Sequence, residues 1–429
     1  MPLSFGLDFG TTNTSLAWTH PDGRVELARF ASPTGDTESF RSLLYLEKAE
    51  APARAAIQSW AGPSGIARYL EADSRGRLIQ SLKSFLSSRT LRGTDVFGRQ
   101  YTIEELIARI VRQIREEATQ LAGQPITHAI VGRPVRFVGS ESTDDDDHAL
   151  QRLTKALQLA GFTHLRFEPE PVAAAWFYES QLDHDELILI GDFGGGTSDF
   201  SLLRVGPGVR RRGRNPSDLL GNAGVGIAGD AFDARIVRQL VSPALGAGST
   251  YHSSGRQLPM PNWIYRKLER WHHLSFLRGA DITNMLRSLH AESDSPEKLR
   301  ALRHIIDENL GFQLHKSVQD LKCRLSTADH APFHFEDGAL LIEEQVSRAD
   351  FESWVQEELT AIETCVDSLF ATSGASPSDV DRVFLTGGSS FVPAVRRIFE
   401  SRFTPARIRT GNEFTSVALG LALMGATPA

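Results

Sequence analysis

The chain has 429 residues, of which 41% are hydrophobic and 23% charged, and its formal net charge is −7. This length suits two or three compact units, and the negative charge argues against the basic surface of a nucleic-acid-binding protein. No stretch has the roughly 18 apolar residues of a membrane helix, and the N-terminus lacks a signal-peptide pattern. These features predict a cytoplasmic protein. Two cysteines, Cys323 and Cys365, fit a reducing compartment and are expected to be buried.

The first predicted element is a β-hairpin at the N-terminus. Every second residue of the segment 3–9 is apolar, as in a half-buried strand, and a Gly-Thr-Thr turn leads to a second short strand over 15–19. Residues 20–60 are rich in turn formers and predict no particular element.

Two helices and a strand are predicted next. Apolar residues recur at helical spacing over 101–121, a short apolar run at 129–131 indicates a buried strand, and 150–161 indicates a second helix. The acidic run 144–147 fits the start of that second helix, because carboxylates stabilise a helix N-terminus.

The N-terminal pattern then returns. A buried strand at 187–190 runs into Asp192-Phe193-Gly194, which repeats Asp8-Phe9-Gly10, and 200–203 forms the return strand. In both places a strand meets a turn of small residues. We interpret this as an internal duplication.

The remaining segments complete an α/β pattern. Residues 206–225, with an arginine cluster at 210–214, are predicted to be a solvated loop. Residues 230–330 are predicted to be mainly helical, with turn-like stretches near 243–262 and 279–296. A buried strand at 383–385, a helix near Pro393 and a final apolar helix at 414–425 follow.

The predicted organisation is two duplicated lobes around a nucleotide cleft. Lobe I would span 1–185, with 405–429 returning to it, and lobe II would span 186–404, including the helical insert at about 230–330.

The two small-residue tips predict phosphate binding. Their residues are Gly10, Thr11, Thr12 and Asn13 in the first tip and Gly194, Gly195, Gly196 and Thr197 in the second. Glycine lets the backbone approach a ligand closely, successive backbone N–H groups can cradle an anion, and threonine adds a hydroxyl donor. A single tip of this kind is usually only a turn, but two facing tips could clamp one phosphate chain.

Carboxylates at the same places predict a metal ion. Asp8 and Asp192 stand where each strand meets its tip, and Asp199 follows on the return strand. Because Mg²⁺ sheds water reluctantly, we expect these residues to hold it through its water shell.

Five segments resemble motifs of the DnaK-type heat-shock chaperones, in the family's order and over nearly the whole chain. They are 6–14 (GLDFGTTNT) and 192–199 (DFGGGTSD) for phosphate, 168–175 (EPEPVAAA) between the lobes, 228–233 (AGDAFD) in lobe II, and 385–393 (LTGGSSFVP) for adenosine. The resemblance implies an actin-like ATPase fold that binds ATP or ADP with Mg²⁺. It also implies nucleotide-dependent lobe closure and a possible protein partner or co-chaperone.

The resemblance also implies roles for individual residues. Lys83 would orient the attacking water, although a solvated surface lysine is the alternative reading of this undistinctive segment. Glu170 would be the interlobe glutamate, and Pro134 would sense the nucleotide state. Further nucleotide contacts are implied for Gly229, Lys322, Ser326, Gly387, Gly388 and Ser389.

The base-binding half departs from the family pattern. Phe391 stands where the family has an arginine, Gln319 and Cys323 replace an acid and an arginine, and Phe414 replaces an aspartate. Selectivity for adenine is therefore expected to be weakened. The chain ends just after the final predicted helix, so it most resembles the short YegD-like branch, which lacks the peptide-binding domain.

Four functions are compatible with this pattern. The leading hypothesis is a chaperone-like ATPase module with weak hydrolysis. A nucleotide-binding scaffold with little hydrolysis comes second, because of the altered base-side residues. A small-molecule kinase ranks lower, since no separate acceptor domain is apparent, and a filament-forming actin relative would need surfaces that a sequence does not reveal.

Overall fold

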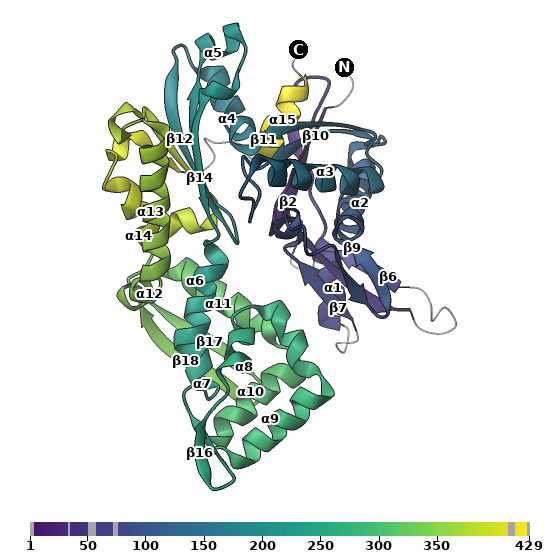
Figure 1. Cartoon of the computed structure of the whole chain (residues 1–429), viewed down its shortest axis with the longest axis vertical. Helices are drawn as coiled ribbons and strands as arrows, with labels where there is room; N and C mark the ends of the chain where they lie inside the picture. Colours follow the sequence, from purple (N-terminus) through teal and green to yellow (C-terminus); the bar gives the residue numbers. More distant parts are fainter. Residues whose placement is uncertain (1–3, 33–34, 50–56, 72–75, 411–416, 427–429) are drawn as a thin grey trace. The chain divides into compact units, whose positions relative to one another are not determined.

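The computed structural model describes residues 4–32, 35–49, 57–71, 76–410 and 417–426 (Figure 1). The chain forms two compact units. Unit 1 comprises residues 1–226, 364–390 and 399–429, and unit 2 comprises residues 227–363 and 391–398. Unit 1 contains both of the sheets that the sequence relates by duplication. The lobe boundaries given above therefore stay a prediction.

Unit 1 is built on two sheets with the same strand order. The first has the order β11-β10-β1-β2-β3, with β4 also paired to β2, and the second has the order β14-β13-β12-β19-β20. In each, an antiparallel hairpin (β1-β2 or β12-β13) has two parallel strands beside its first strand. The shared topology is what the predicted duplication requires.

The strands of the first sheet are β1 (Phe5–Phe9), β2 (Asn13–Thr19), β3 (Val25–Leu27), β4 (Phe40–Arg41), β10 (His128–Arg133) and β11 (His164–Pro169). Those of the second are β12 (Glu186–Phe193), β13 (Ser198–Val205), β14 (Leu219–Val225), β19 (Arg382–Thr386) and β20 (Ile408–Thr410). Two small sheets complete unit 1: β6-β5-β7 (Ile57–Ala61, Leu43–Lys48, Arg77–Gln80) and β8-β9 (Gly93–Val96, Arg99–Thr102).

The helices of unit 1 pack on these sheets. They are α1 (Gly62–Glu71), α2 (Ile103–Ala122), α3 (Thr143–Leu159), α4 (Glu170–Gln181), α5 (Pro207–Arg212) and α15 (Val417–Ala426). The predicted helix at 101–121 is confirmed as α2, which a Thr102–Glu105 capping box begins and left-handed Gly123 ends. The acidic run 144–147 lies in the first turns of α3, as expected.

Helices α4 and α15 lie side by side although they are far apart in the sequence (Figure 1). Their backbones touch at one point, because a Cβ added to Gly420 would lie 1.8 Å from the carbonyl oxygen of Ala173. Only glycine allows this approach. This contact fixes the N-terminal part of α4 against α15.

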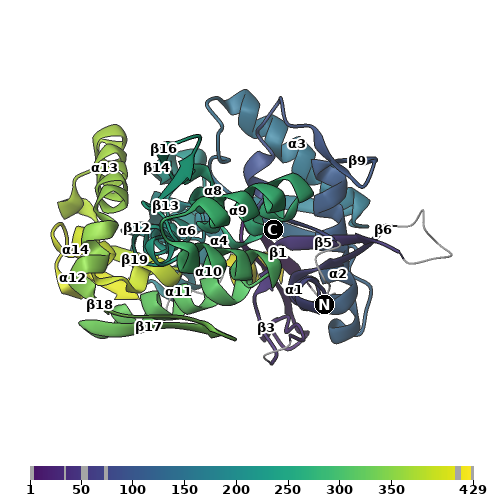
Figure 2. The same ribbon diagram turned by 90° about the horizontal axis from the view of Figure 1, so that it is seen from below.

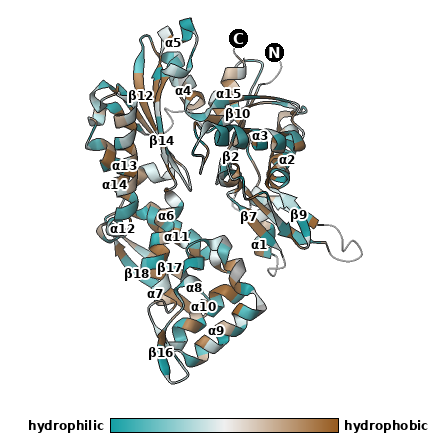
Figure 3. Cartoon of the chain, viewed as in Figure 1, coloured by the Kyte–Doolittle hydropathy of each residue, from teal (hydrophilic) through white to brown (hydrophobic). Residues whose placement is uncertain are grey.

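Unit 2 is mainly helical, as predicted for 230–330. Its helices are α6 (Gly229–Ile236), α7 (Ser242–Ala244), α8 (Asn262–Leu268), α9 (Ala280–Glu292), α10 (Pro296–Asp307), α11 (Gly311–Leu325) and α12 (Arg348–Trp354). The turns of α9 and α10 alternate between hydrophobic and hydrophilic colour, as in amphipathic helices (Figure 3). Unit 2 also holds the hairpins β15-β16 (Thr250–Ser253, Arg256–Pro259) and β17-β18 (His330–Asp337, Leu340–Ser347), and α11 packs along β17 (Figure 2). Helices α13 (Gln356–Ser373) and α14 (Pro393–Glu400) contain residues of both units.

Several expectations about loops were wrong. Residues 206–225 form α5, a 3₁₀ turn and strand β14. The sequence pattern did not indicate β14, because glycines are typical of loops. In this strand glycine is required by packing, since a Cβ on Gly224 would lie 2.6 Å from an oxygen of Asp199. Helix α9 covers much of 279–296, which was expected to be turn-like. Strands β3 to β6 occupy parts of 20–60, for which the sequence predicted no particular element.

The expectation that both cysteines are buried was also wrong. Cys323 is exposed and Cys365 is only partly buried. In the arginine cluster, Arg212 pairs with buried Asp218, and Arg214 lies 2.7 Å from a carboxylate oxygen of Glu179. The Arg212 pair lies within the segment, whereas Arg214 ties the segment to α4; Arg210, Arg211 and Arg212 are exposed, as expected of a solvated cluster. Among the described helices, none is both long and apolar enough to cross a membrane.

Candidate nucleotide site

The first predicted tip is fixed by the segment that follows it. The hydroxyl of Ser42 donates a hydrogen bond to the carbonyl oxygen of Gly10 (2.7 Å), and the Ser42 amide donates to the carbonyl of Thr12 (2.8 Å). Ser42 also shares a 2.8 Å hydroxyl contact with buried Thr14. The tip is therefore held in one conformation before any ligand binds.

The second tip faces the first. The amide of Gly194 donates to the carbonyl of Thr197 (2.9 Å) and closes the turn. A Cβ added to Gly195 would lie 2.3 Å from the hydroxyl oxygen of Thr12, so the tips are in direct contact. That hydroxyl is buried and has no hydrogen-bond partner within the described part of the chain. A buried polar atom without a partner is costly, and a ligand oxygen would satisfy it.

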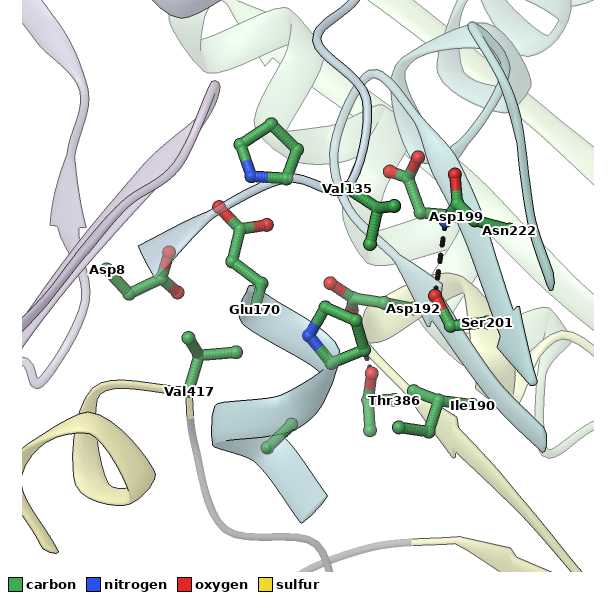
Figure 4. A pocket seen from close by; sticks show the side chains of 13 residues that line it. Asp8, Val135, Glu170, Ile190, Asp192, Asp199, Ser201, Asn222, Thr386 and Val417 are labelled. Atoms are coloured by element: carbon green, nitrogen blue, oxygen red, sulfur yellow. Dashed lines mark hydrogen bonds between the residues drawn. The ribbon is translucent and has the colours of Figure 1, made fainter. Parts of the chain in front are cut away.

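The carboxylates come from the strands beneath the tips. Asp192 and Asp199 are direct register partners on β12 and β13, whereas Asp8 on β1 faces Ser15 on β2. The two hairpins therefore match in shape but differ in charge. In the close-up, Asp8, Glu170, Asp192 and Asp199 lie around one space (Figure 4).

Crowding of these acids changes their titration. Burial, together with the charge of Glu170, raises the pKa of Asp8 to about 7. Burial and the facing charge of Asp192 likewise raise the pKa of Asp199 to about 7. The pKa of Asp192 is raised mainly by burial, although the Thr386 hydroxyl donates a 2.7 Å hydrogen bond to its carboxylate and opposes the shift. The site thus has more negative charge than its own cations neutralise.

Lys83 supplies a positive charge to this space. It lies on the 3₁₀ helix Leu82–Phe85, is 8% exposed, and places Nζ 2.8 Å from Oε1 of Glu170. Burial lowers the pKa of Lys83, but the charges of Glu170 and Asp8 outweigh that effect and the pKa is raised. The alternative of a solvated surface lysine was therefore wrong, and Lys83 stays charged.

Two cavities of about 220 and 160 Å³ share a wall of four carboxylates. The smaller cavity is lined by Lys83, both tips and the acids, so every predicted tip residue and every predicted catalytic residue lies around it. The larger is more apolar and includes Val135, Ala174 and Ile190. All lining residues belong to unit 1.

The predicted base-side residues do not line these cavities. Gly387, Gly388 and Ser389 lie in unit 1, where Ser389 is buried. Gly229, Lys322 and Ser326 lie in unit 2, and Lys322 is 2.6 Å from Asp233 and 3.1 Å from the carbonyl of Gly229. Phe391 is 59% exposed, and Phe414 lies outside the described residues.

Comparison with known proteins assigns the family. The family model "Hsp70 protein" matches residues 83–246 and 299–427, which is more than half of the chain. The chain belongs to the Hsp70 family. The chain therefore has an actin-like ATPase fold, as the motifs implied.

Individual Hsp70 relatives match at modest identity. The chain is 24% identical to the chaperone protein DnaK of Thermosipho melanesiensis over 429 residues, which cover 98% of this chain and 58% of the relative. It is 25% identical to DnaK of Thermus thermophilus over 431 residues, 99% of this chain and 60% of the relative. DnaK of Trieres chinensis is 26% identical over 329 residues, 76% and 43% respectively. The chain spans about three fifths of the length of the first two.

The donor set of this Hsp70 chain fits a hydrated cation. Three carboxylates with raised pKa values would be relieved by positive charge. Within the described residues, no group of three His, Cys, Asp or Glu side chains is close enough to bind a metal directly. If this chain holds Mg²⁺, Asp8, Asp192 and Asp199 would do so through water, because this ion sheds its water shell reluctantly.

Some residues of the Hsp70 site were missed by sequence reasoning. Thr386, which bonds Asp192, was quoted within a motif without a role, and its place at the end of β19 was the available signal. Ser201 and Asn222 share a 3.2 Å hydrogen bond in the larger cavity and come from strands β13 and β14 (Figure 4). Asn222 could not be found because β14 was taken for a loop.

Proposed function

We propose that this chain binds Mg-ATP in the two unit 1 cavities and hydrolyses it slowly, as a chaperone-like ATPase module. The observation that carries the proposal is one cavity lined by both small-residue tips, four carboxylates and Lys83. Backbone amides and the Thr12 hydroxyl suit phosphate oxygens, and the acids suit a hydrated cation. The Hsp70 membership supports the same reading.

In this proposal each charged group has a separate task. Lys83, held by Glu170 at 2.8 Å, would orient a water molecule toward the terminal phosphate. Asp199, which faces Asp192 across the hairpin, could accept a proton from that water. Bound Mg²⁺ would neutralise phosphate charge. Phosphoryl transfer depends mostly on positioning and on the stabilisation of charge, and these residues are of the types that supply both.

Nucleotide-dependent lobe closure is part of the proposal. Glu170 is the first residue of α4, and α4 contacts α15 through the close approach at Gly420. A ligand that moved Glu170 would therefore act directly on a packed helix pair. Membership of the short YegD-like branch, a co-chaperone or other protein partner, and a cytoplasmic location remain proposals as well.

Calorimetry and phosphate release test the function together. ATP should bind in Mg²⁺ and bind much more weakly in EDTA, because without the cation the carboxylates face the phosphates. Asp192→Asn should lower affinity or turnover by at least about tenfold, roughly 1.4 kcal/mol. Glu344→Gln, an exposed acid on β18 in unit 2, is the matched control and should leave both unchanged. Equal ATP affinity in Mg²⁺ and EDTA would remove the metal from the site.

A scaffold with little hydrolysis is the second candidate. It is favoured by Lys322, whose ammonium is already paired with Asp233 in unit 2, and by the missing charge at Phe391. Tight ATP binding without phosphate release above the buffer rate would select it. A sugar-dependent loss of ATP would instead select the lower-ranked kinase.

A further inference from the structure

Arg136 belongs to the smaller nucleotide cavity, although the sequence pattern did not indicate it as a site residue. It lies just after the end of β10, in the segment that leads to α3. Pro134 lines both cavities, Val135 lines the larger (Figure 4), and Arg136 lines the smaller. Both small-residue tips and Lys83 line that same smaller cavity. A second cationic side chain therefore lies beside the predicted phosphate site.

The backbone next to Arg136 is fixed by hydrogen bonds. The amide of Phe137 donates to Oδ1 of Asp146 (2.9 Å), and the Phe137 ring is buried. The hydroxyl of Ser87 donates to the carbonyl oxygen of Val138 (2.5 Å). The direction in which the Arg136 side chain leaves the backbone is therefore set before a ligand binds.

The guanidinium of Arg136 is not held tightly by the protein. Its side chain is 59% exposed, and its one ion pair within the described residues joins Nε to Oδ2 of Asp146 at 3.9 Å. That distance is longer than a hydrogen bond, and exposed ion pairs contribute little to stability. Arg89, in contrast, makes hydrogen bonds to Asp144 and Asp145 at the start of the same helix. The N–H groups of Arg136 are thus available to a ligand in the cavity.

The charge of the cavity favours such a contact. Four carboxylates line it, and the Lys83 ammonium lies 2.8 Å from one of them, Glu170. A polyphosphate brings more negative charge into this space, so a cation that is not already paired with the acids stabilises it. A guanidinium presents N–H groups in a fork that matches two oxygens of one phosphate, and such charge-assisted bonds are about twice as strong as neutral ones.

We propose that Arg136 binds the terminal phosphate of ATP through its guanidinium and stabilises the charge on that phosphate during hydrolysis. This assignment rests on the proposed function. Lys83 has a separate task, because its ammonium is held by Glu170 and orients the attacking water. Arginines supplied by the same chain serve other phosphoryl-transfer enzymes in this way.

The hydrolytic step assigns one role to each group. The water oxygen bonds to the terminal phosphorus, the bond from that phosphorus to the bridging oxygen breaks, and its electron pair leaves with ADP. The water proton passes to Asp199. Arg136 keeps its proton throughout, because a guanidinium does not titrate in proteins, and it bonds the non-bridging oxygens.

Calorimetry with a nonhydrolysable ATP analogue and with ADP, both in Mg²⁺, tests the assignment. Arg136→Met should weaken binding of the analogue by at least about tenfold and of ADP by less than about threefold, because only the analogue carries the terminal phosphate. Arg136→Lys should lie in between, since an ammonium keeps the charge but not the fork. Phosphate release by Arg136→Met at saturating ATP should fall by at least about tenfold.

Two control variants separate a phosphate contact from a structural role. Arg89→Met removes an exposed arginine that pairs with the start of α3. Asp146→Asn removes the charge paired with Arg136, while its amide oxygen can still accept from Phe137. Both should bind the analogue as the wild type does, and circular dichroism verifies the fold of every variant.

The outcomes distinguish this assignment from the proposed function. Equal loss of analogue and ADP affinity in Arg136→Met, or no loss of either, overturns the assignment and leaves the proposed function standing. A loss in Asp146→Asn as large as that in Arg136→Met does the same. A wild-type chain that binds neither nucleotide overturns both.

Discussion

Replacement of Arg152 by methionine should destabilise unit 1 and disturb Lys83. The Arg152 guanidinium is buried and pairs with Glu104 at 2.7 Å. It also donates hydrogen bonds to four carbonyl oxygens of the segment that follows Lys83: those of Phe85, Leu86, Ser88 and Leu91, at 3.0 to 3.4 Å. One side chain thus fixes the path of the chain just after the lysine of the site.

The magnitude follows from what the substitution leaves behind. Arg152→Met removes the ion-pair partner of a nearly buried carboxylate, Glu104, and takes one donor away from each of four carbonyl oxygens. Breaking a buried ion pair costs about 3–5 kcal/mol. Removing both charges destabilises the fold less than removing one of them. The double variant Glu104→Met/Arg152→Met should therefore regain about half or more of the stability lost in Arg152→Met.

Urea unfolding and hydrogen exchange measure the effect. The urea midpoint of Arg152→Met should fall, and amides in the segment 82–91 should exchange faster, because their local structure has lost its anchor. Arg112→Met, an exposed arginine of α2 with one carbonyl bond, should shift stability by no more than about 0.5 kcal/mol. If the proposed function holds, phosphate release by Arg152→Met should also fall.

The same pair predicts a pH dependence. The pKa of Glu104 is lowered from its ordinary 4.5, because hydrogen bonds and the charge of Arg152 outweigh the opposing effect of burial. A carboxyl with a lowered pKa stabilises the fold above its unfolded value and loses that contribution as pH falls below it. The difference between wild type and Arg152→Met should therefore shrink below pH 4.5. A cost under about 1 kcal/mol at pH 7, with unchanged exchange at 82–91, would refute this account.

Three further predictions concern single positions. Gly195→Ala should weaken ATP binding in calorimetry by at least about tenfold, since its Cβ would lie 2.3 Å from the Thr12 hydroxyl. Gly420→Val should cost about 3 kcal/mol in urea unfolding, because its Cβ meets a backbone carbonyl of α4; a stable variant would mean that α4 and α15 can separate freely. With Phe391 in place of an arginine, competition titrations should give ATP over GTP selectivity of about tenfold or less, and a preference above about a thousandfold would contradict this.

The phosphate half of the site was predictable because its signals are local. Asp8 and Asp192 each stand at a strand end before a small-residue turn, and both the strand and the turn leave marks in a few consecutive residues. The shared topology of the two sheets follows from the same repeat. Lys83 was harder to place, because its ion pair with Glu170 joins segments far apart in the chain.

Other features depend on tertiary contacts that a pattern does not carry. Strand β14 was read as a loop because its glycines resemble a turn, while their reason is close contact with β13. Arg152 sits on a helix like any solvated arginine, and only the folded chain brings it to Glu104 and the carbonyls after Lys83. The spacing of residues along α3 therefore does not indicate the structural role of Arg152.

The unequal hairpins also give the site a direction. Two related hairpins with equal charge would offer a polyphosphate chain two equivalent ways to lie between them. Asp199 opposite Asp192 on one hairpin, and uncharged Ser15 opposite Asp8 on the other, remove that equivalence. A cation is drawn toward the hairpin with two acids, so the ends of an elongated anion are no longer interchangeable. A duplicated scaffold has in this way acquired a polarity that its backbone symmetry alone does not provide.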